Sequence, residues 1–208
     1  MADSMTKADK SFIAAVARQS AATVHEALGK KGALPSAIKP VTRGMRLCGP
    51  AFTVDSPPAN NLLIHQAIYQ AQPGDVLVVK VGDHYEAGYW GEIMAVAAVA
   101  RGLAGLVIDG CVRDSAEMTR MKFSAFSRGL CIRGTGKQAG GTLNKPLTIG
   151  DVTVHPGDMV LGDDDGVVVI PQEDFATIVE KAEKRVAVED KIMARLRGGE
   201  STLDIYKF

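Results

Sequence analysis

Residues 73–114 read PGDVLVVKVGDHYEAGYWGEIMAVAAVARGLAGLVIDGCVRD, and this stretch decides the fold class. Val76–Val81 and Leu103–Ile108 are short, nearly continuous apolar runs, which are typical of strands buried on both faces. Between them, Gly91–Arg101 is rich in small apolar residues and predicts a helix that ends at Gly102. A strand, a helix and a second strand in this order predict a βαβ unit with parallel strands.

The flanking sequence extends this unit in both directions. The further predicted elements are a helix over Ser11–Leu28, a strand over Leu47–Val54, a helix from Asn60 or Asn61 to about Ala71, a short helix over Asp114–Met121, short strands within Phe123–Arg133 and Leu147–Ile170, a loop over Gly134–Gly141, and a long charged amphipathic helix over Gln172–Arg197. No segment has the composition of a linker. We therefore expect residues 1–208 to form one α/β domain, with a central β-structure flanked by helices.

The composition excludes several classes of protein. Lys plus Arg and Asp plus Glu number 24 each, so the charge balance predicts neither a nucleic acid nor an anionic membrane as partner. Cys48, Cys111 and Cys131 form no C-x-x-C pattern, which argues against a zinc site or a disulfide framework. Met1–Lys10 lacks the apolar core of a secretory signal, and no apolar run is long enough for a membrane span. We expect a cytoplasmic protein.

Polar residues stand where the βαβ unit would bind a ligand. In open α/β sheets, ligands bind beyond the carboxyl ends of the strands. Gly91-Glu92 begins the predicted helix and offers unpaired backbone N–H groups to a small carboxylate. Arg113 adds a planar fork for a carboxylate or keto oxygen, and Asp114 is a hard oxygen ligand suited to Mg²⁺ or Mn²⁺. Together these groups could stabilise an enolate.

Each of these residues also has a structural interpretation. Asp114 with Glu117 three residues later resembles a capping box, which stabilises a helix by about 1 kcal/mol. Arg113 could be a surface arginine and Gly91 an ordinary loop glycine. The interpretations are compatible, because a capping aspartate can still present its free oxygen to a metal.

Other groups are weaker candidates. Asp83, His84 and Glu86 lie in the loop before Gly91 and could form a metal cluster, although a single histidine there is more often structural. Asp163-Asp164-Asp165-Gly166 resembles the start of a calcium loop but lacks its alternating ligands, so we expect a turn. The remaining candidates are His25, His65 and His155, which show no ligand spacing, and Lys80 and Lys137, either of which could form a Schiff base.

Two longer strings resemble a known family. GDHYEAGYWGEIMAVAAVARGLAGLVIDGCVRD, followed by Glu117, and TLNKPLTIGDVTVHPGDMVLGDDDGVVVIP resemble the class II pyruvate aldolases of the RraA-like family. These enzymes cleave 4-hydroxy-4-methyl-2-oxoglutarate or 4-carboxy-4-hydroxy-2-oxoadipate. The resemblance runs from about Val24 to Arg197, and its specific part is R-D-x-x-E with the upstream G-E.

The resemblance implies an αββα sandwich similar to phosphohistidine-swivelling domains, and homotrimers or hexamers with sites at subunit interfaces. It implies that the N-terminal helix and the C-terminal helix, about residues 172–197, make subunit contacts. The implied site roles are as follows: the amides of Gly91, Glu92, Ile93 and Met94 bind the substrate carboxylate, Arg113 binds the pyruvyl oxygens, Asp114 is the direct metal ligand, Glu92 and Glu117 act through metal-bound water, and Glu189 approaches from a neighbouring subunit, with Glu180, Glu183 and Asp190 as alternatives in register.

The function implied is a retro-aldol cleavage that depends on Mg²⁺, with Mn²⁺ or Co²⁺ possible. A 4-hydroxy-2-oxo acid would yield pyruvate and a second 2-oxo acid, as in aromatic catabolism, with oxaloacetate decarboxylation as a side activity through the same enolate. The alternative is a non-catalytic regulator that binds and inhibits an RNA-degrading enzyme. Methyl transfer, a third label in this family, is disfavoured because Gly102–Gly105 leads into a strand instead of following one.

Overall fold

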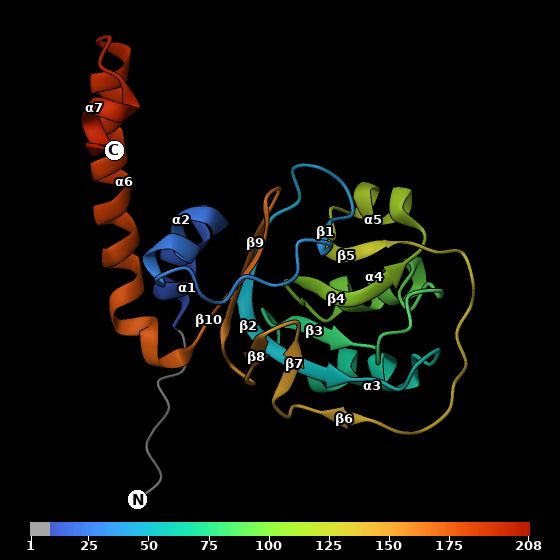
Figure 1. The fold of residues 1–208 in the computed structure, drawn as a ribbon. Helices are drawn as coiled ribbons and strands as arrows, with labels where there is room; N and C mark the ends of the chain where they lie inside the picture. Colours follow the sequence, from blue (N-terminus) through green and yellow to red (C-terminus); the bar gives the residue numbers. More distant parts are fainter. Residues whose placement is uncertain (1–8) are drawn as a thin grey trace, which may run out of the picture.

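The computed structural model describes residues 9–208, so the expectation for Met1–Lys10 falls mostly outside the described residues. A mixed sheet of order β1-β5-β4-β3-β2-β9-β10, with β6 beside β2, forms the centre of the molecule (Figure 1). Its strands are β1 (Lys39–Pro40), β2 (Leu47–Asp55), β3 (Val76–Lys80), β4 (Gly105–Val112), β5 (Ala125–Leu130), β6 (Thr142–Leu143), β9 (Met159–Asp163) and β10 (Gly166–Ile170). A separate hairpin consists of β7 (Leu147–Ile149) and β8 (Val152–Val154).

Helices cover the sheet on two sides, which confirms the α/β class. They are α1 (Lys10–Ala17), α2 (Ala21–Ala27), α3 (Leu62–Gln70), α4 (Glu92–Ala100), α5 (Ser115–Met121), a short 3₁₀ turn over Gln172–Asp174, α6 (Phe175–Arg197) and α7 (Thr202–Tyr206). The four strands β2, β3, β4 and β5 are parallel neighbours joined by α3, α4 and α5. The predicted βαβ unit is therefore present, and the carboxyl ends of β3 and β4 meet at one edge of the sheet.

The sheet curls until it is nearly closed. Residues 32–34 run beside β10, where Leu34 N–H donates to the Val167 carbonyl at 2.9 Å. The chain then continues into β1, which pairs antiparallel with β5 at the other end of the sheet. Val76 and Val78 of β3 point into the curl, and Leu77 and Val79 pack under the outer helices. This alternation explains why β3 is apolar throughout, because both of its faces are buried.

Two predicted boundaries are wrong for identifiable reasons. The single helix expected over Ser11–Leu28 is broken into α1 and α2, because the Ser20 hydroxyl accepts from Thr23 N–H at 3.0 Å and caps a new helix. The strand expected to end at Ile108 continues through Asp109 and Gly110 to Val112. Asp109 is compatible with a buried strand because its carboxylate is ion-paired with Arg128 of β5.

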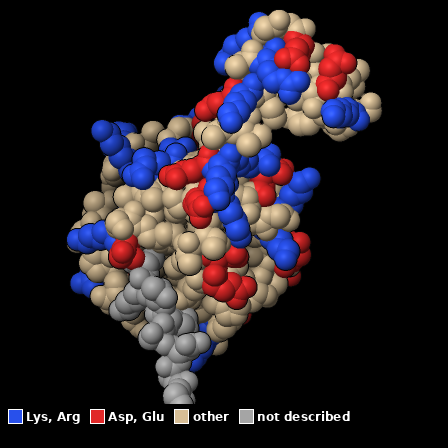
Figure 2. Space-filling model, turned by 90° about the vertical axis from the view of Figure 1, so that its left-hand side faces the viewer, with Lys and Arg blue, Asp and Glu red and all other residues tan. Residues whose placement is uncertain are grey.

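The C-terminal helix leaves the body of the molecule. Figure 1 shows α6 starting beside α1 and α2 and then projecting away, with α7 folded back at its tip. Ile178 and Ala182, both in its first half, are the buried residues of α6. Figure 2 shows basic and acidic side chains interspersed over this face and the projecting helix. Within residues 9–208, no helix combines the length and apolarity needed to cross a membrane.

Candidate active site

The two predicted loops meet because the segment before α4 runs beside the end of β4. Gly88 forms a parallel bridge with Cys111, and Tyr89 N–H donates to the Cys111 carbonyl at 3.0 Å. Arg113 N–H in turn donates to the Trp90 carbonyl at 2.8 Å. These backbone hydrogen bonds place the start of α4 next to the Arg113-Asp114 pair, as predicted.

The Asp114 carboxylate is turned toward α4. Its Oδ2 accepts from Glu92 N–H at 2.9 Å and lies 3.8 Å from Arg113 Nε. A Cβ on Gly91 would lie 2.4 Å from the same oxygen, closer than real side-chain contacts allow. The backbone of Gly91 is extended, with φ −154°, so the position needs glycine for space and not for its dihedral angles.

The capping-box interpretation of Asp114 and Glu117 is wrong. Asp114 stands at the N-cap position of α5, but its φ of 57° is left-handed and its side chain makes no capping hydrogen bond there. Glu117 instead forms an ion pair with Arg120 at 2.6 Å. A left-handed residue other than glycine is strained by about 1 kcal/mol or more, and such strain is concentrated at functional sites.

A cavity of about 290 Å³ opens beside this pair, and we call it the Lys137 cavity. Its lining residues are Asn61, His65, Gly88, Tyr89, Gly91, Ile93, Met94, Arg113, Asp114, Gly134, Thr135 and Lys137. The Lys137 ammonium donates to Oδ1 of Asn61, and the buried Asn61 amide donates to the Tyr89 carbonyl at 2.8 Å. Lys137 is therefore held by a buried partner, although it comes from the glycine-rich loop.

Asn61 also explains why the sequence did not reveal this arrangement. It occupies the N-cap position of α3, as predicted, but its side chain makes no capping bond and turns into the cavity instead. The loop reaches it across 76 residues, and it is anchored by Gly136 N–H donating to the Ala59 carbonyl at 2.7 Å. The sequence offered Lys137 only as a candidate Schiff-base lysine, since nothing local links a glycine-rich loop to the start of α3.

The Lys137 cavity is suited to a small anion. Arg113 and Lys137 supply two cations against the single carboxylate of Asp114. The N–H groups of Ile93 and Met94 lie in the first turn of α4, where they have no partner within the helix. Burial lowers the pKa of His65, and the positive charge of Lys137 lowers it further, so His65 is neutral at pH 7.

A second cavity, of about 360 Å³, shares Arg113 and Asp114 with the first. We call it the Ile132 cavity. Its remaining lining residues are Ser115, Leu130, Cys131 and Ile132, and the side chains of Leu130 and Ile132 are exposed. Arg113 and Asp114 therefore border two spaces of different character, one cationic and polar and the other largely apolar.

Three predicted acids are not brought to these cavities within one chain. The Glu92 side chain is exposed and lines neither cavity, and Glu117 is engaged with Arg120. Glu189 lies on α6, on the far side of the sheet from α4 and α5 (Figure 1), where it pairs with Arg185 at 2.8 Å. The roles given to these three residues remain predictions.

The other metal candidates are dispersed among separate partners. His84 Nδ1 contacts the Tyr89 hydroxyl at 2.9 Å, Asp83 accepts from Tyr85, and Glu86 pairs with Arg133. Asp163–Asp165 form the turn between β9 and β10, as expected. Across residues 9–208 there is no group of three His, Cys, Asp or Glu side chains that could hold a metal. A metal at Asp114 would complete its coordination with water and substrate, as Mg²⁺ commonly does.

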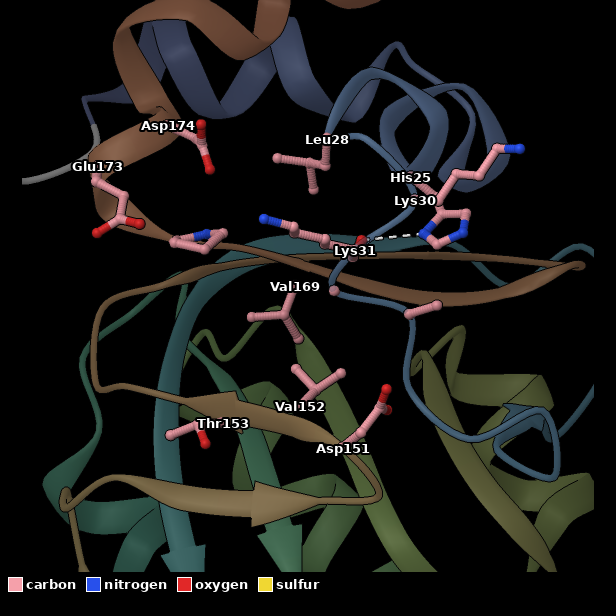
Figure 3. Close-up of a pocket in the computed structure, with 13 residues that line it drawn as sticks. His25, Leu28, Lys30, Lys31, Asp151, Val152, Thr153, Val169, Glu173 and Asp174 are labelled. Carbon is pink, nitrogen blue, oxygen red and sulfur yellow. Dashed lines mark hydrogen bonds between the residues drawn. The ribbon is translucent and has the colours of Figure 1, made fainter.

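The largest cavity lies elsewhere. This hairpin cavity, of about 630 Å³, lies between the end of α2, the start of α6 and the β7–β8 turn. Figure 3 shows Lys31 extending beneath Leu28, with the carboxylates of Glu173 and Asp174 at one side and Asp151 at another. None of the predicted site residues lines it. Its volume exceeds that of the Lys137 cavity, but its charges of both signs belong mostly to exposed side chains.

Comparison with known proteins agrees with this geometry. The family model for RraA-like proteins, described as Aldolase/RraA, matches residues 21–169. A relative from Halalkalibacterium halodurans, named "Putative 4-hydroxy-4-methyl-2-oxoglutarate aldolase", is 33% identical over 91% of this chain and 94% of its own length. The crystal structure of an uncharacterized protein from Pseudomonas syringae pv. tomato has a TM-score of 0.86 and 29% identity, covering 97% of this chain and 95% of that one.

A further neighbour carries a different description. The RNA-processing inhibitor RraA from Thermus thermophilis superposes with a TM-score of 0.67 and 26% identity, over 73% of this chain and 92% of that one. Aldolases and inhibitors of RNA processing thus both occur among the named relatives. The fold, the matched residues and the length of the aligned relatives agree, and this chain belongs to the RraA-like family.

Proposed function

We propose that the protein is a metal-dependent aldolase that cleaves a 4-hydroxy-2-oxo acid to pyruvate and a second 2-oxo acid. The observation that carries this proposal is the grouping of Arg113, Asp114 and Lys137 with the first-turn amides of α4 around one small cavity. The names of the relatives support the aldol chemistry.

Each group has a distinct part in the reaction. The C1 carboxylate binds between the α4 amides and Lys137, and Arg113 donates to the C2 oxygen. A base removes the C4 hydroxyl proton, the C3–C4 bond breaks, and its electron pair forms the enolate of pyruvate. Arg113 stabilises the negative charge that develops on the C2 oxygen, and C3 then takes a proton from water.

Mg²⁺ is the proposed metal, and Mn²⁺ or Co²⁺ would suit the same oxygen donor. Bound at Asp114, the ion supplies a Lewis acid that polarises the C2 keto group. The donor set fits this assignment, because Oδ2 of Asp114 is oriented by Glu92 N–H while Oδ1 remains available and the side chain is 40% exposed. Glu92 and Glu117 are proposed to act through water in the same region.

The proposed base is Glu189 of a second copy of the chain, with Glu92 assisting. Glu189 cannot reach the site of its own chain, since α6 projects from the opposite side of the sheet (Figure 1). The exposed apolar residues of the projecting segment, among them Val188, Met193 and Tyr206, support a contact with another subunit. We propose a homotrimer or hexamer with sites at subunit interfaces.

The second candidate function is inhibition of an RNA-degrading enzyme by docking. It is favoured by the structural similarity to the RNA-processing inhibitor RraA. A protein that only docks has no physical need for a glycine that makes room for Asp114, or for a buried Asn61 that holds Lys137. The two functions differ in whether small 2-oxo acids bind.

The deciding experiment measures pyruvate release from 4-hydroxy-4-methyl-2-oxoglutarate, with Mg²⁺ and after chelation by EDTA. We expect release that is lost with EDTA and restored by added Mg²⁺. Oxaloacetate should be decarboxylated more slowly with the same metal dependence, since both reactions pass through the enolate. Full activity after chelation would contradict the metal dependence, and absence of cleavage in both conditions would contradict the aldolase assignment.

A further inference from the structure

We propose that the Ile132 cavity selects substrates whose substituent at C4 is an uncharged alkyl group. This inference rests on the proposed function, and it concerns which 4-hydroxy-2-oxo acid is cleaved. It is drawn from the contrast between the two cavities that share Arg113 and Asp114.

The geometry of the substrate assigns its two ends to different cavities. C2 of a 2-oxo acid is trigonal, so C1 and C3 leave it in directions about 120° apart, as at any sp² carbon. The amides of Ile93 and Met94 and the ammonium of Lys137 fix C1 in the Lys137 cavity. With the C2 oxygen at Arg113, the C3–C4 part extends away from Lys137 and into the Ile132 cavity.

The lining of the Ile132 cavity then decides what C4 can carry. Among its six lining residues, Arg113 is the one cation, and it is already engaged with the C2 oxygen. Its five N–H donors can also bind one carboxylate on C4. A second carboxylate, on a carboxymethyl substituent, would lie against Leu130 and Ile132 beside the Asp114 charge, whereas a methyl group would cover apolar surface.

The nearest other cation does not change this balance. Arg133 follows Ile132 in the chain, but its guanidinium pairs with Glu86 at 3.6 Å and does not line the cavity. Lys137 lines the other cavity, where it is tied to Asn61. Within the described part of the chain, a tricarboxylic substrate therefore has one carboxylate more than the site can neutralise.

The test compares cleavage of two substrates by the whole protein with Mg²⁺. We expect kcat/KM for 4-hydroxy-4-methyl-2-oxoglutarate to exceed that for 4-carboxy-4-hydroxy-2-oxoadipate by about tenfold or more, because an unpaired charge next to apolar side chains is rejected. Ile132→Lys should reduce this preference or reverse it. Ile132→Met, which keeps the volume and adds no charge, should retain it, and Leu130→Lys provides a second variant in case Ile132→Lys folds poorly.

Binding of uncleavable compounds separates this proposal from the proposed function. 4-Methyl-2-oxoglutarate and 4-carboxy-2-oxoadipate lack the hydroxyl that cleavage requires, and calorimetry should give the same order of affinity as the kinetics. Equal values of kcat/KM for the two substrates, equal affinities for the two analogues, or an unchanged preference in both lysine variants would overturn the proposal while leaving the aldolase assignment intact. Failure of both substrates to react would overturn the proposed function itself.

Discussion

The Lys137 cavity and the hairpin cavity contain similar side chains, arranged in different ways. Both have lysine and aspartate in their linings, and the hairpin cavity is the larger, at about 630 Å³ against 290 Å³. In the Lys137 cavity the charged groups are fixed by buried or backbone partners, namely Asn61 for Lys137 and Glu92 N–H for Asp114. In the hairpin cavity, Lys31 and Asp151 extend from exposed turns (Figure 3). Preorganisation, and not volume, distinguishes the candidate site.

The largest expected effect comes from removing the Asp114 carboxylate. Asp114→Ala should lower kcat/KM for pyruvate release by about 10³-fold, because the Lewis acid contributes several kcal/mol to transition-state stabilisation. The matched change in the hairpin cavity, Asp151→Ala, should leave kcat/KM within about twofold, since surface substitutions away from a site have small effects. Similar losses in the two variants would remove the distinction between the cavities. Circular dichroism checks folding, because Asp114 also orients the start of α4.

Gly91→Ala tests whether the close contact between Gly91 and Asp114 matters. The added methyl would lie 2.4 Å from Asp114 Oδ2 and must displace the carboxylate. Since a misplacement of about 1 Å can cost on the order of 10²-fold in rate, we expect a loss of that size. The control is Gly129→Ala on β5, where the new Cβ meets only Cys111 Sγ at 3.8 Å. Normal kinetics for Gly91→Ala would show that the contact can relax without consequence.

Lys137→Met should act mainly on substrate binding. Loss of a hydrogen bond to a charged group costs roughly 1.5–3 kcal/mol, which corresponds to an increase of about 10- to 100-fold in KM. We expect kcat to change less, because Lys137 is assigned to the C1 carboxylate and not to the reacting bond. Lys31→Met makes the same change in the hairpin cavity and should not alter KM. Complete loss of activity with KM unchanged would instead support a Schiff-base role for Lys137.

The smallest effect concerns the pH dependence of stability. The pKa of His65 is lowered below its ordinary value of 6.5, so the unfolded chain binds more protons in the window between the folded-state pKa and 6.5. The free energy of unfolding should therefore fall as pH decreases below about 6.5. The wild type should lose more than His65→Gln, by on the order of a few tenths of a kcal/mol after solvent screening. Urea titrations at pH 7 and pH 5.5 measure this, and the difference should shrink in a Lys137→Met background. An identical pH dependence in wild type and His65→Gln would contradict the assignment.

The sequence predicts the part of the fold that depends on local patterns. Apolar runs identify β3 and most of β4, and small residues identify α4, because burial on both faces leaves a plain signature. The near closure of the sheet was not predictable, since it depends on residues 32–34 pairing with β10, far along the chain. The break at Ser20 was detectable in principle, because serine is a strong N-cap, but the apolar spacing continues across it.

The candidate site divides in the same way. Gly91, Arg113 and Asp114 follow from the rule that ligands bind beyond the carboxyl ends of parallel strands. Asn61, His65 and Lys137 join them only through long-range contacts between the start of α3 and the glycine-rich loop. Glu189 illustrates the opposite limit, since its assigned role needs a second copy of the chain, on which one chain's geometry has no bearing.

The most direct measurement is the thermal stability of the protein with oxalate, a mimic of pyruvate enolate, in the presence and absence of Mg²⁺. A ligand that binds the folded state raises the melting temperature by mass action. The account predicts that oxalate raises it only when Mg²⁺ is present, and that this coupling is lost in Asp114→Ala and kept in Asp151→Ala. An equal rise with EDTA, or a Mg²⁺-dependent rise that survives in Asp114→Ala, would contradict the metal site at Asp114.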